Sequence, residues 1–337
     1  MTHPVSIDKY QIVEHLGSGS FGDVYRVHDR ALKAEKAIKV VGATDPARFL
    51  SNLEEAQILN KCRHKHIVVI NEANIFPVNG TRRVVLDLEY IAEGSLESAL
   101  GSRWISIKDA VNCIRGALLG LEHAHAQGFL HRDIKPGNIL ISNAGAKLSD
   151  FGLATNAAVD LIGSAQGYTT HLPPEYFTDS QTTVSSDVFA TGITFFRAVS
   201  NIADWRGVTR SIPLIRLKIE KGKLIDAIGF AEFIPGAVRK IISKACAVDA
   251  SKRFQCAKEM RQKLDSLRFS IDWISIGSHK WEGRLGSTVY TAEVIPTSNE
   301  VNFKKNGRKV SAKCMKFPSL SAAISALHNE VASTTLQ

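Results

Sequence analysis

The chain has 337 residues, of which 44% are hydrophobic and 22% charged, a composition close to the globular average. This excludes a peptide-sized scaffold and a chain that is disordered as a whole, because it contains enough apolar residues to form a sizeable core. The formal net charge of +9 first suggests an anionic partner, but the surplus is spread along the chain and only residues 304–309 form a basic run. Because Asn306-Gly307 within that run favours a β-hairpin tip, we interpret it as solvated lysines and expect no nucleic-acid partner.

The expected elements begin with strands. Alternating apolar and β-branched residues in the first 90 residues predict five of them, at Tyr10–Leu16, Val24–His28, Ala37–Val41, Val68–Phe76 and Val84–Tyr90. One helix is predicted near Pro46–Cys62, with Asp45 as its N-cap and the proline in its first turn.

Helices are expected in the middle of the chain, where apolar residues recur at three- and four-residue steps, near 107–121, 185–199, 236–246 and 256–267. Three strands are expected after them, at Ile271–Ile276, Ser287–Ile295 and Val310–Phe317. Strands first and helices second predict an α+β arrangement in two lobes, followed by a small β-rich module.

Cysteine usage and the N-terminus bear on the compartment. The 5 cysteines are an odd number at long spacings without a Cys-x-x-Cys pair, so neither a zinc cluster nor a disulfide framework is indicated. The N-terminus has no basic segment followed by an apolar core, and no uncharged apolar stretch of about 18 residues occurs. We therefore expect a cytoplasmic protein with reduced thiols and no membrane partner.

The first motif that carries chemistry is glycine-rich, Gly17-Ser18-Gly19-Ser20-Phe21-Gly22. A Gly-x-Gly-x-x-Gly pattern also occurs before the helix of dinucleotide folds, but here a predicted strand follows it. The glycines therefore form the bend of a hairpin, where backbone N–H groups can close over phosphates.

A lysine on the third predicted strand comes next. Lys39 lies among apolar neighbours, from where its ammonium can reach the α- and β-phosphates of a nucleotide. Glu55 is its preferred partner, because of the spacing to Ile58-Leu59, and the adjacent Glu54 is the alternative.

The most specific segment runs from His131 to Leu140, His-Arg-Asp-Ile-Lys-Pro-Gly-Asn-Ile-Leu, and is followed by Asp150-Phe151-Gly152. With the earlier motifs in order over about residues 10–267, the chain resembles the eukaryotic-type (Hanks-type) serine/threonine protein kinases. The resemblance implies a bilobal fold, with a β-rich N-lobe over 10–92 and a helical C-lobe over 93–268. Residues 1–9 are then a tail and 269–337 an accessory domain. The compact lobes look most like those of bacterial or phage members.

The resemblance also assigns the catalytic roles, with ATP and Mg²⁺ as cofactors and proteins as substrates. Asp133 would accept the proton of the attacking hydroxyl, and Lys135 would steady the γ-phosphate, which favours serine or threonine as the acceptor. Asn138 and Asp150 would bind Mg²⁺, which agrees with the preference of that ion for hard oxygen ligands. Autophosphorylation is expected as well.

Nucleotide-contacting positions follow from the same resemblance. Residues 86–91 look like the strand and hinge beside adenine, with Leu88 as gatekeeper and the backbone of two residues as the hydrogen-bonding edge, Glu89 and Ile91. The adenine ring would lie between apolar side chains that are equally ordinary core residues, Val24, Ala37 and Leu140.

Two further positions fit the resemblance, and one of them favours a protein substrate. Asp187 resembles the buried aspartate that holds the catalytic loop, and Arg253 would pair with Glu175. That ion pair ties down the peptide-docking part of protein kinases, and small-molecule kinases commonly lack it.

The segment from Asp150 to Glu175 departs from the family pattern. Tyr168 stands where serine/threonine kinases usually have threonine, and His171 where they usually have tyrosine. Arg132 could bind a phosphate on this segment. Its candidate phosphosites, which could equally be solvated loop hydroxyls, are Thr155, Ser164, Thr169 and Thr170.

A metal-binding site and a pseudokinase are the alternatives to an active kinase. Two histidine pairs, His64/His66 and His123/His125, could suggest a metal, but their spacing turns the rings apart on a helix and no carboxylate or cysteine completes a site. A pseudokinase scaffold is the alternative function, although that class generally lacks one of the residues equivalent to Lys39, Asp133 or Asp150.

The accessory domain shows an echo of the first lobe. Residues 281–290 resemble the glycine hairpin, Lys313 resembles Lys39, and Glu330 follows at nearly the same spacing as Glu55. The module is therefore either a generic accessory domain or the start of a second, incomplete kinase-like N-lobe with a regulatory or partner-binding role. The oligomeric state cannot be predicted from the sequence.

Overall fold

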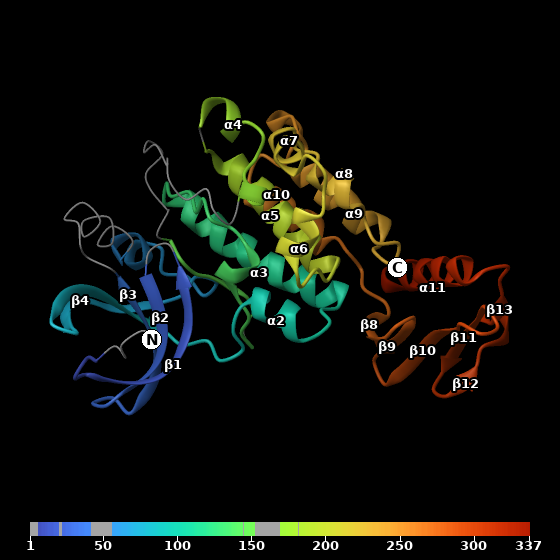
Figure 1. Ribbon diagram of the computed structural model, residues 1–337, viewed down its shortest axis with the longest axis horizontal. Coiled ribbons are helices and arrows are strands. Elements are labelled where there is room, and N and C mark those ends of the chain that lie inside the picture. The colour runs from blue at the N-terminus through green and yellow to red at the C-terminus, as the bar shows by residue number, and fades with distance from the viewer. Residues whose placement is uncertain (1–5, 20–21, 42–55, 144, 152–168, 181) are drawn as a thin grey trace.

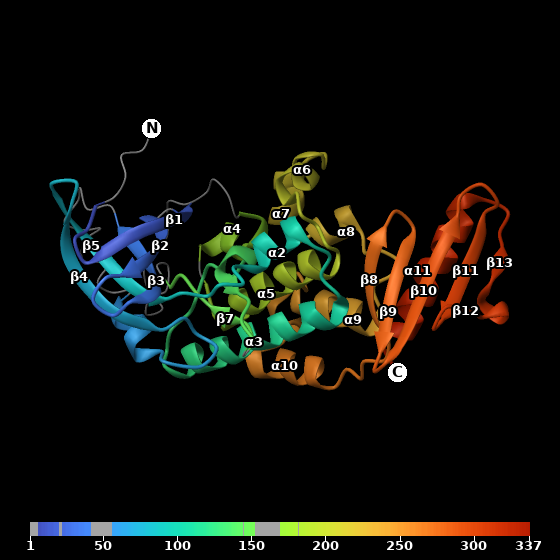
Figure 2. The ribbon, with the colours of Figure 1, turned by 90° about the horizontal axis from the view of Figure 1, so that it is seen from below.

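The computed structural model describes residues 6–19, 22–41, 56–143, 145–151, 169–180 and 182–337. A five-stranded sheet, a bundle of helices and a second sheet with one helix follow one another in space as they do along the chain (Figures 1 and 2). The expected two-lobed α+β arrangement with a β-rich C-terminal module is therefore confirmed. Among the described residues, no helix is both long and apolar enough to span a membrane.

The N-lobe is an antiparallel sheet of five strands in the order β1-β2-β3-β5-β4. The strands are β1 (Tyr10–Gly19), β2 (Gly22–Asp29), β3 (Ala34–Val41), β4 (Ile70–Val78) and β5 (Thr81–Glu89), all close to their predicted bounds. Residues 56–61 are helical, as expected for the end of the helix near Pro46–Cys62, whose earlier part lies outside the described residues.

Strand alternation separates the two faces of this sheet. On β3, Ile38 and Val40 belong to a small outer core, whereas Ala37 and Lys39 point to the opposite face. Leu86 of β5 lies on that second face and joins the large core shared with the helices. The sheet therefore presents Lys39 toward the C-lobe.

The C-lobe is built around α5 (Val184–Val199), which is buried along nearly its whole length. The longer helices confirm the predicted stripes and are α3 (Ile107–Ala126), α9 (Gly236–Ala245) and α10 (Ala257–Asp265). Five short helices are too brief to show a periodic stripe and were not predicted, α2 (Leu96–Ser102), α4 (Tyr176–Asp179), α6 (Trp205–Arg210), α7 (Ile215–Glu220) and α8 (Leu224–Ile228). A two-stranded ladder, β6 (Ile139–Leu140) with β7 (Lys147–Leu148), faces the N-lobe.

The C-terminal module is an antiparallel sheet in the order β12-β11-β10-β9-β8, with β13 pairing to β11 and α11 packed against it. Its elements are β8 (Asp272–Gly277), β9 (Lys280–Leu285), β10 (Thr288–Ile295), β11 (Glu300–Lys305), β12 (Arg308–Lys309), β13 (Met315–Lys316) and α11 (Leu320–Thr335). Asn306 and Gly307 form the β11–β12 turn with φ of 48° and 76°, which confirms the predicted hairpin.

The strand expected at Val310–Phe317 was wrong for most of its length. The chain forms a 3₁₀ turn at Ser311–Lys313, and only Met315–Lys316 pairs with β11. The Cys314 side chain lies 3.3 Å from the Phe303 N–H, a donor that a neighbouring strand would otherwise engage. The residues preceding Met315 therefore leave the ladder.

The likeness of the module to a second N-lobe has mixed support. Lys313 does form an ion pair with Glu330 of α11. However, Lys313 lies in the 3₁₀ turn and the strand after it pairs with β11, whereas β3, which carries Lys39, pairs with β2. A second, incomplete kinase-like lobe stays a prediction.

An aromatic cluster joins the module to the C-lobe. The ring of Trp281 lies 5.2 Å from that of Trp104 and 5.0 Å from that of Phe233, and His328 of α11 contacts the rings of Trp281 and Phe233. The Ile271 N–H donates to the Thr334 carbonyl, so the end of α11 is bonded to the residues at which the module begins. The C-lobe and the module therefore share one continuous hydrophobic core.

Candidate active site

The glycine hairpin is the bend between β1 and β2, where Gly19 pairs with Gly22. Gly22 has a φ of 138°, and a β-carbon there would come within 2.3 Å of the Val40 carbonyl oxygen. Only glycine therefore fits this position. Gly17 has open space around its α-carbon, and the Ser18 hydroxyl donates to Asp23 at 2.5 Å. The tip residues 20–21 lie outside the described residues.

Lys39 and Asp150 meet where the two lobes face each other. The Lys39 ammonium is 2.7 Å from Asp150 Oδ1, and the Lys39 side chain is 6% exposed. Burial opposes ionisation of Asp150, but the adjacent Lys39 outweighs it and holds the pKa of this carboxyl below its usual value. Glu55, the expected partner of Lys39, lies outside the described residues.

The catalytic loop holds Asp133 between two polar groups. The Lys135 ammonium is 2.6 Å from Asp133 Oδ2, and the Asn138 side-chain amide donates to the same oxygen at 2.9 Å and to the Asp133 carbonyl at 2.8 Å. Burial raises the pKa of Asp133, and the charge of Lys135 counteracts part of this. The Asp133 carboxylate is thus both oriented and made more basic than an exposed aspartate.

Asp187, on α5, anchors this loop through its backbone. Its carboxylate accepts backbone N–H groups from His131 at 2.9 Å and Arg132 at 2.8 Å. His125 of α3 is hydrogen-bonded to the same carboxylate at 2.8 Å, a positioning contact that the sequence analysis missed. Its signal was the place of His125 between the predicted helix near 107–121 and the loop that begins at His131.

His131 connects the catalytic loop to the segment that carries Asp150. Its Nε2 donates to the Ser149 carbonyl at 3.1 Å, and its ring packs 4.6 Å from that of Phe151. Asp150 itself has a φ of 61°, a left-handed conformation that non-glycine residues seldom adopt. The strained turn directs the Asp150 carboxylate toward Lys39.

The hinge follows β5. The β3–β5 register places Leu88 of β5 opposite Ala37 of β3. On the other side of β3, Val24 of β2 lies opposite Lys39. Leu140 of β6 is tied to the segment after the hinge by its bridge to Ser95. Val24, Leu88 and Leu140 are half-buried and Ala37 is buried, so apolar surface lines both sides of the lobe junction.

Glu89 contributes more than the backbone edge predicted for it. Its N–H already donates to the Val69 carbonyl at 3.0 Å, so its carbonyl is the group left for a base. Its carboxylate is 2.6 Å from the Lys147 ammonium of β7 and accepts the Val69 N–H at 2.7 Å. This clamp between hinge and C-lobe was missed, because no local pattern links residues 58 positions apart.

The predicted ion pair forms at the end of the segment from Asp150 to Glu175. Arg253 Nη1 and Nη2 each lie 2.7 Å from a Glu175 carboxylate oxygen, and the guanidinium side chain is 0% exposed. Arg253 also donates to the carbonyls of Ala247 and Val248 and stacks 4.9 Å over the Phe189 ring.

The end of the segment before Glu175 is held by Trp205, whose indole N–H donates to Thr170 Oγ1 at 3.0 Å. His171 is fully buried, and burial, together with the charges of Arg197 and Lys135, lowers its pKa to about 3. His171 is therefore neutral at physiological pH. Residues 152–168, which include Tyr168 and the candidate phosphosites Thr155 and Ser164, lie outside the described residues.

One histidine of each pair takes part in a stack, whereas His125 instead binds Asp187. The His64 and His123 rings are 5.0 Å apart and nearly parallel, and His66 lies 5.5 Å from His64. In the described part of the chain, no three His, Cys, Asp or Glu side chains are grouped so as to hold a metal ion.

The oxygen donors of Asn138 and Asp150 fit Mg²⁺. Both Asn138 amide hydrogens are used on Asp133, which leaves the amide oxygen as the ligand atom. Asp150 is ionised and already holds one cation, the Lys39 ammonium. One amide and one carboxylate oxygen are the hard ligands that this ion prefers, with phosphate oxygens and water completing its shell.

Comparison with known proteins gives a consistent result. The protein kinase domain family matches residues 10–264. The chain is 28% identical over 327 residues to the serine/threonine-protein kinase PrkC of Bacillus subtilis, covering 89% of this chain and 49% of the relative. It is 27% identical to a probable serine/threonine-protein kinase PknB of Lactococcus lactis, covering 75% of this chain and 41% of the relative. The chain thus spans about half the length, or less, of these curated relatives.

Proposed function

The chain belongs to the eukaryotic-type protein kinase family, and on that premise we propose that it transfers the γ-phosphate of ATP to serine and threonine hydroxyls of proteins. The observation that carries the proposal is the convergence of two elements at the lobe junction. Lys39 from the N-lobe sheet contacts Asp150, and Asp133 is held by Lys135 and Asn138. These are the residue types that bind and transfer a phosphoryl group in this family.

The N-lobe and the hinge are proposed to bind the nucleotide. Val24, Ala37 and Leu140 would enclose the adenine ring, and the Glu89 carbonyl with the Ile91 backbone would bond its edge. The hairpin backbone at residues 17–22 would cover the phosphates, where the required glycine at 22 brings β2 close to β3. Lys39 would then exchange its contact with Asp150 for the α- and β-phosphates.

Asn138 and Asp150 would hold Mg²⁺, which when bound neutralises charge on the phosphates. Asp133 is proposed to orient the acceptor hydroxyl and to accept its proton as the oxygen–phosphorus bond forms. The bond from the γ-phosphorus to the bridging oxygen breaks, and ADP leaves. Lys135, 2.6 Å from Asp133, is placed to neutralise the transferred phosphoryl oxygens.

Two features support the acceptor class. Lys135 stands two residues after Asp133, as in serine/threonine kinases, and the named relatives are serine/threonine kinases. The Glu175–Arg253 pair supports a protein substrate over a small molecule. Autophosphorylation on the segment before Glu175 is part of the proposal. Since Lys39, Asp133, Asn138 and Asp150 are all present, we favour an enzyme over a pseudokinase scaffold.

The test is incubation of the purified chain with γ-labelled ATP, Mg²⁺ and a generic protein acceptor such as casein. We expect label in the acceptor with the natural chain and none with the Asp133→Asn variant. No labelled protein at all, including the chain itself, would refute an active kinase. Equal labelling by the variant would remove Asp133 from the proposed role.

A further inference from the structure

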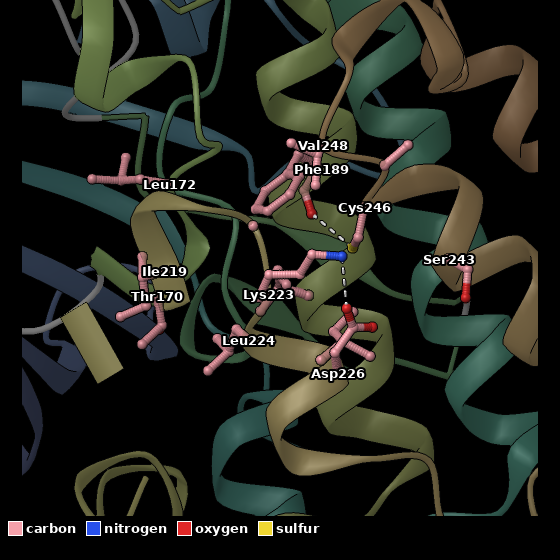
Figure 3. A pocket seen from close by; sticks show the side chains of 14 residues that line it. Thr170, Leu172, Phe189, Ile219, Lys223, Leu224, Asp226, Ser243, Cys246 and Val248 are labelled. Carbon is pink, nitrogen blue, oxygen red and sulfur yellow. Dashed lines mark hydrogen bonds and ion pairs between the residues drawn. The ribbon is translucent and has the colours of Figure 1, made fainter. Parts of the chain in front are cut away.

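A cavity of about 200 Å³ lies in the C-lobe beneath the end of the segment that precedes Glu175. The cavity is lined by Thr170 and Leu172, by residues of α5 and α9, and by residues 219–226 of α7 and α8 (Figure 3). Its walls combine apolar and polar surface, and the Lys223 ammonium lies 3.0 Å from Asp226 within the lining.

The size of the cavity restricts what it can bind. Pockets for cofactors and drug-sized molecules usually measure about 300–1,000 Å³. At about 200 Å³ this cavity is too small for a whole nucleotide but large enough for a single bulky side chain. Pockets that receive one apolar anchor are typical of the centre of a protein–protein interface.

Residues 206–226, the stretch of chain whose last part lines the cavity, carry an excess of cations. Arg206, Arg210 and Lys221 are exposed and Lys218 is half-buried, and no acidic side chain of the described residues pairs with any of the four. The two ion pairs on this surface, Arg216–Glu220 and Lys223–Asp226, each have at least one largely exposed member. Such pairs contribute little stability, so a partner carboxylate can replace Glu220 or Asp226 at low cost.

Apolar side chains accompany these cations. Leu214 is 74% exposed and Leu217 is 43% exposed, on the same short stretch of chain. Leu214 also has a φ of 54°, a left-handed conformation that a non-glycine residue adopts only where its surroundings impose it. The residues that precede the lining residues 219–226 therefore present exposed leucines among arginines and lysines.

We propose that residues 206–226 and this cavity form a docking surface for an acidic segment of a partner protein, which inserts one bulky apolar side chain between Leu172 and Ile219. The four unpaired cations favour a negatively charged partner. A second copy of this chain fits poorly, because a symmetric contact would place the same basic surface against itself.

The cavity lies against the segment before Glu175, so a partner docked there would contact that segment. Leu172 is three residues before Glu175, and Thr170 is held by the indole of Trp205. An anchor in the cavity therefore touches the same segment that forms the peptide-docking region. Docking would increase the local concentration of the partner beside that region without contacting Lys39, Asp133 or Asp150.

The test measures binding, so it does not depend on catalysis. The probes are fluorescein-labelled 15-residue peptides of Glu, Asp, Ser and Gly, with one Phe, Leu or Met placed at each position in turn. Fluorescence anisotropy with the natural full chain should show peptides that bind about tenfold more tightly than the same sequence with serine at the anchor position. Their affinity should fall as the salt concentration rises.

Three variants separate the parts of the proposal. Lys218→Glu combined with Lys221→Glu should weaken peptide binding about tenfold or more, and Val248→Asp should do so at the apolar rim, where Val248 is 46% exposed. Arg308→Glu, on the distant β11–β12 hairpin, is the control and should change nothing. Circular dichroism checks that each variant is folded.

Several results would overturn the proposal. These are peptides that bind no better than their serine counterparts, affinities unchanged by the first two variants, and equal weakening by Arg308→Glu. An oligonucleotide of equal charge that binds as tightly would identify a general polyanion surface instead. Concentration-dependent dimers lost in the Lys218→Glu/Lys221→Glu variant would identify a second copy as the occupant.

Discussion

Removing the carboxylate of Glu175 should destabilise the C-lobe more than any comparable surface change. The Arg253 guanidinium makes two hydrogen bonds to Glu175 and one each to the carbonyls of Ala247 and Val248, and its side chain is fully buried. In Glu175→Ala, two donors and a buried positive charge lose their partner. Breaking a buried pair in this way costs about 3–5 kcal/mol of unfolding free energy.

We expect the loss of unfolding free energy in Glu175→Ala to lie at the lower end of that range. Glu175 is 26% exposed, so water can enter the space left by its side chain and solvate part of the guanidinium. We therefore expect a loss of about 3 kcal/mol. The double variant Glu175→Ala/Arg253→Met should be less destabilised than Glu175→Ala alone, because it removes the uncompensated charge as well.

Urea denaturation followed by tryptophan fluorescence measures these differences. The matched control is Glu220→Ala, which breaks an exposed pair with Arg216, whose side chain is 92% exposed, and should cost less than about 1 kcal/mol. A loss for Glu175→Ala no larger than that of the control would refute the reasoning. So would a double variant that is less stable than the single one.

Three further predictions follow from named contacts. Lys39→Met should leave the fold intact and nucleotide binding at the hinge measurable. It should slow phosphoryl transfer by orders of magnitude, because the ammonium at the phosphates is lost. Retained transfer rates would mean that another cation substitutes for Lys39. Asp133 must be ionised to accept a proton and burial raises its pKa, so kcat/KM should fall as the pH drops through that raised pKa. Lys135→Met removes the ammonium that lowers the pKa of Asp133 and should therefore shift this acidic limb of the pH profile to higher pH. Acidic limbs that coincide in the natural chain and the variant would contradict the account. Trp281→Ala should cost about 3–5 kcal/mol in urea denaturation, because Trp281 is 3% exposed and packs against rings of both the module and the C-lobe; a loss below about 1 kcal/mol would show that the two parts do not share a core.

Short-range pattern was enough to predict the strands of the N-lobe and the longer helices of the C-lobe. The strand alternation around Lys39 and the spacing from Asp133 to Asn138 are local features, and the structure places these side chains at one junction. The resemblance to a family supplied the pairing of Glu175 with Arg253, which lie 78 residues apart.

Contacts between distant segments were not predicted where no family motif marked them. Arg197 is buried in α5 and pairs with Glu97 of α2, 100 residues away, and nothing in either local sequence indicates the other. The cluster of Trp104 with Trp281 likewise depends on how the module docks. The Val310–Phe317 strand failed because Cys314 takes a backbone donor that a strand would have paired.

The central claim is tested most directly by phosphoamino-acid analysis after incubation with Mg²⁺ and ATP labelled at either the α- or the γ-phosphate. The account predicts label from γ-labelled ATP alone, recovered as phosphoserine or phosphothreonine, with the natural chain and not with Asp133→Asn. Label recovered as phosphotyrosine, label transferred from the α-position, or no label in any protein would contradict it.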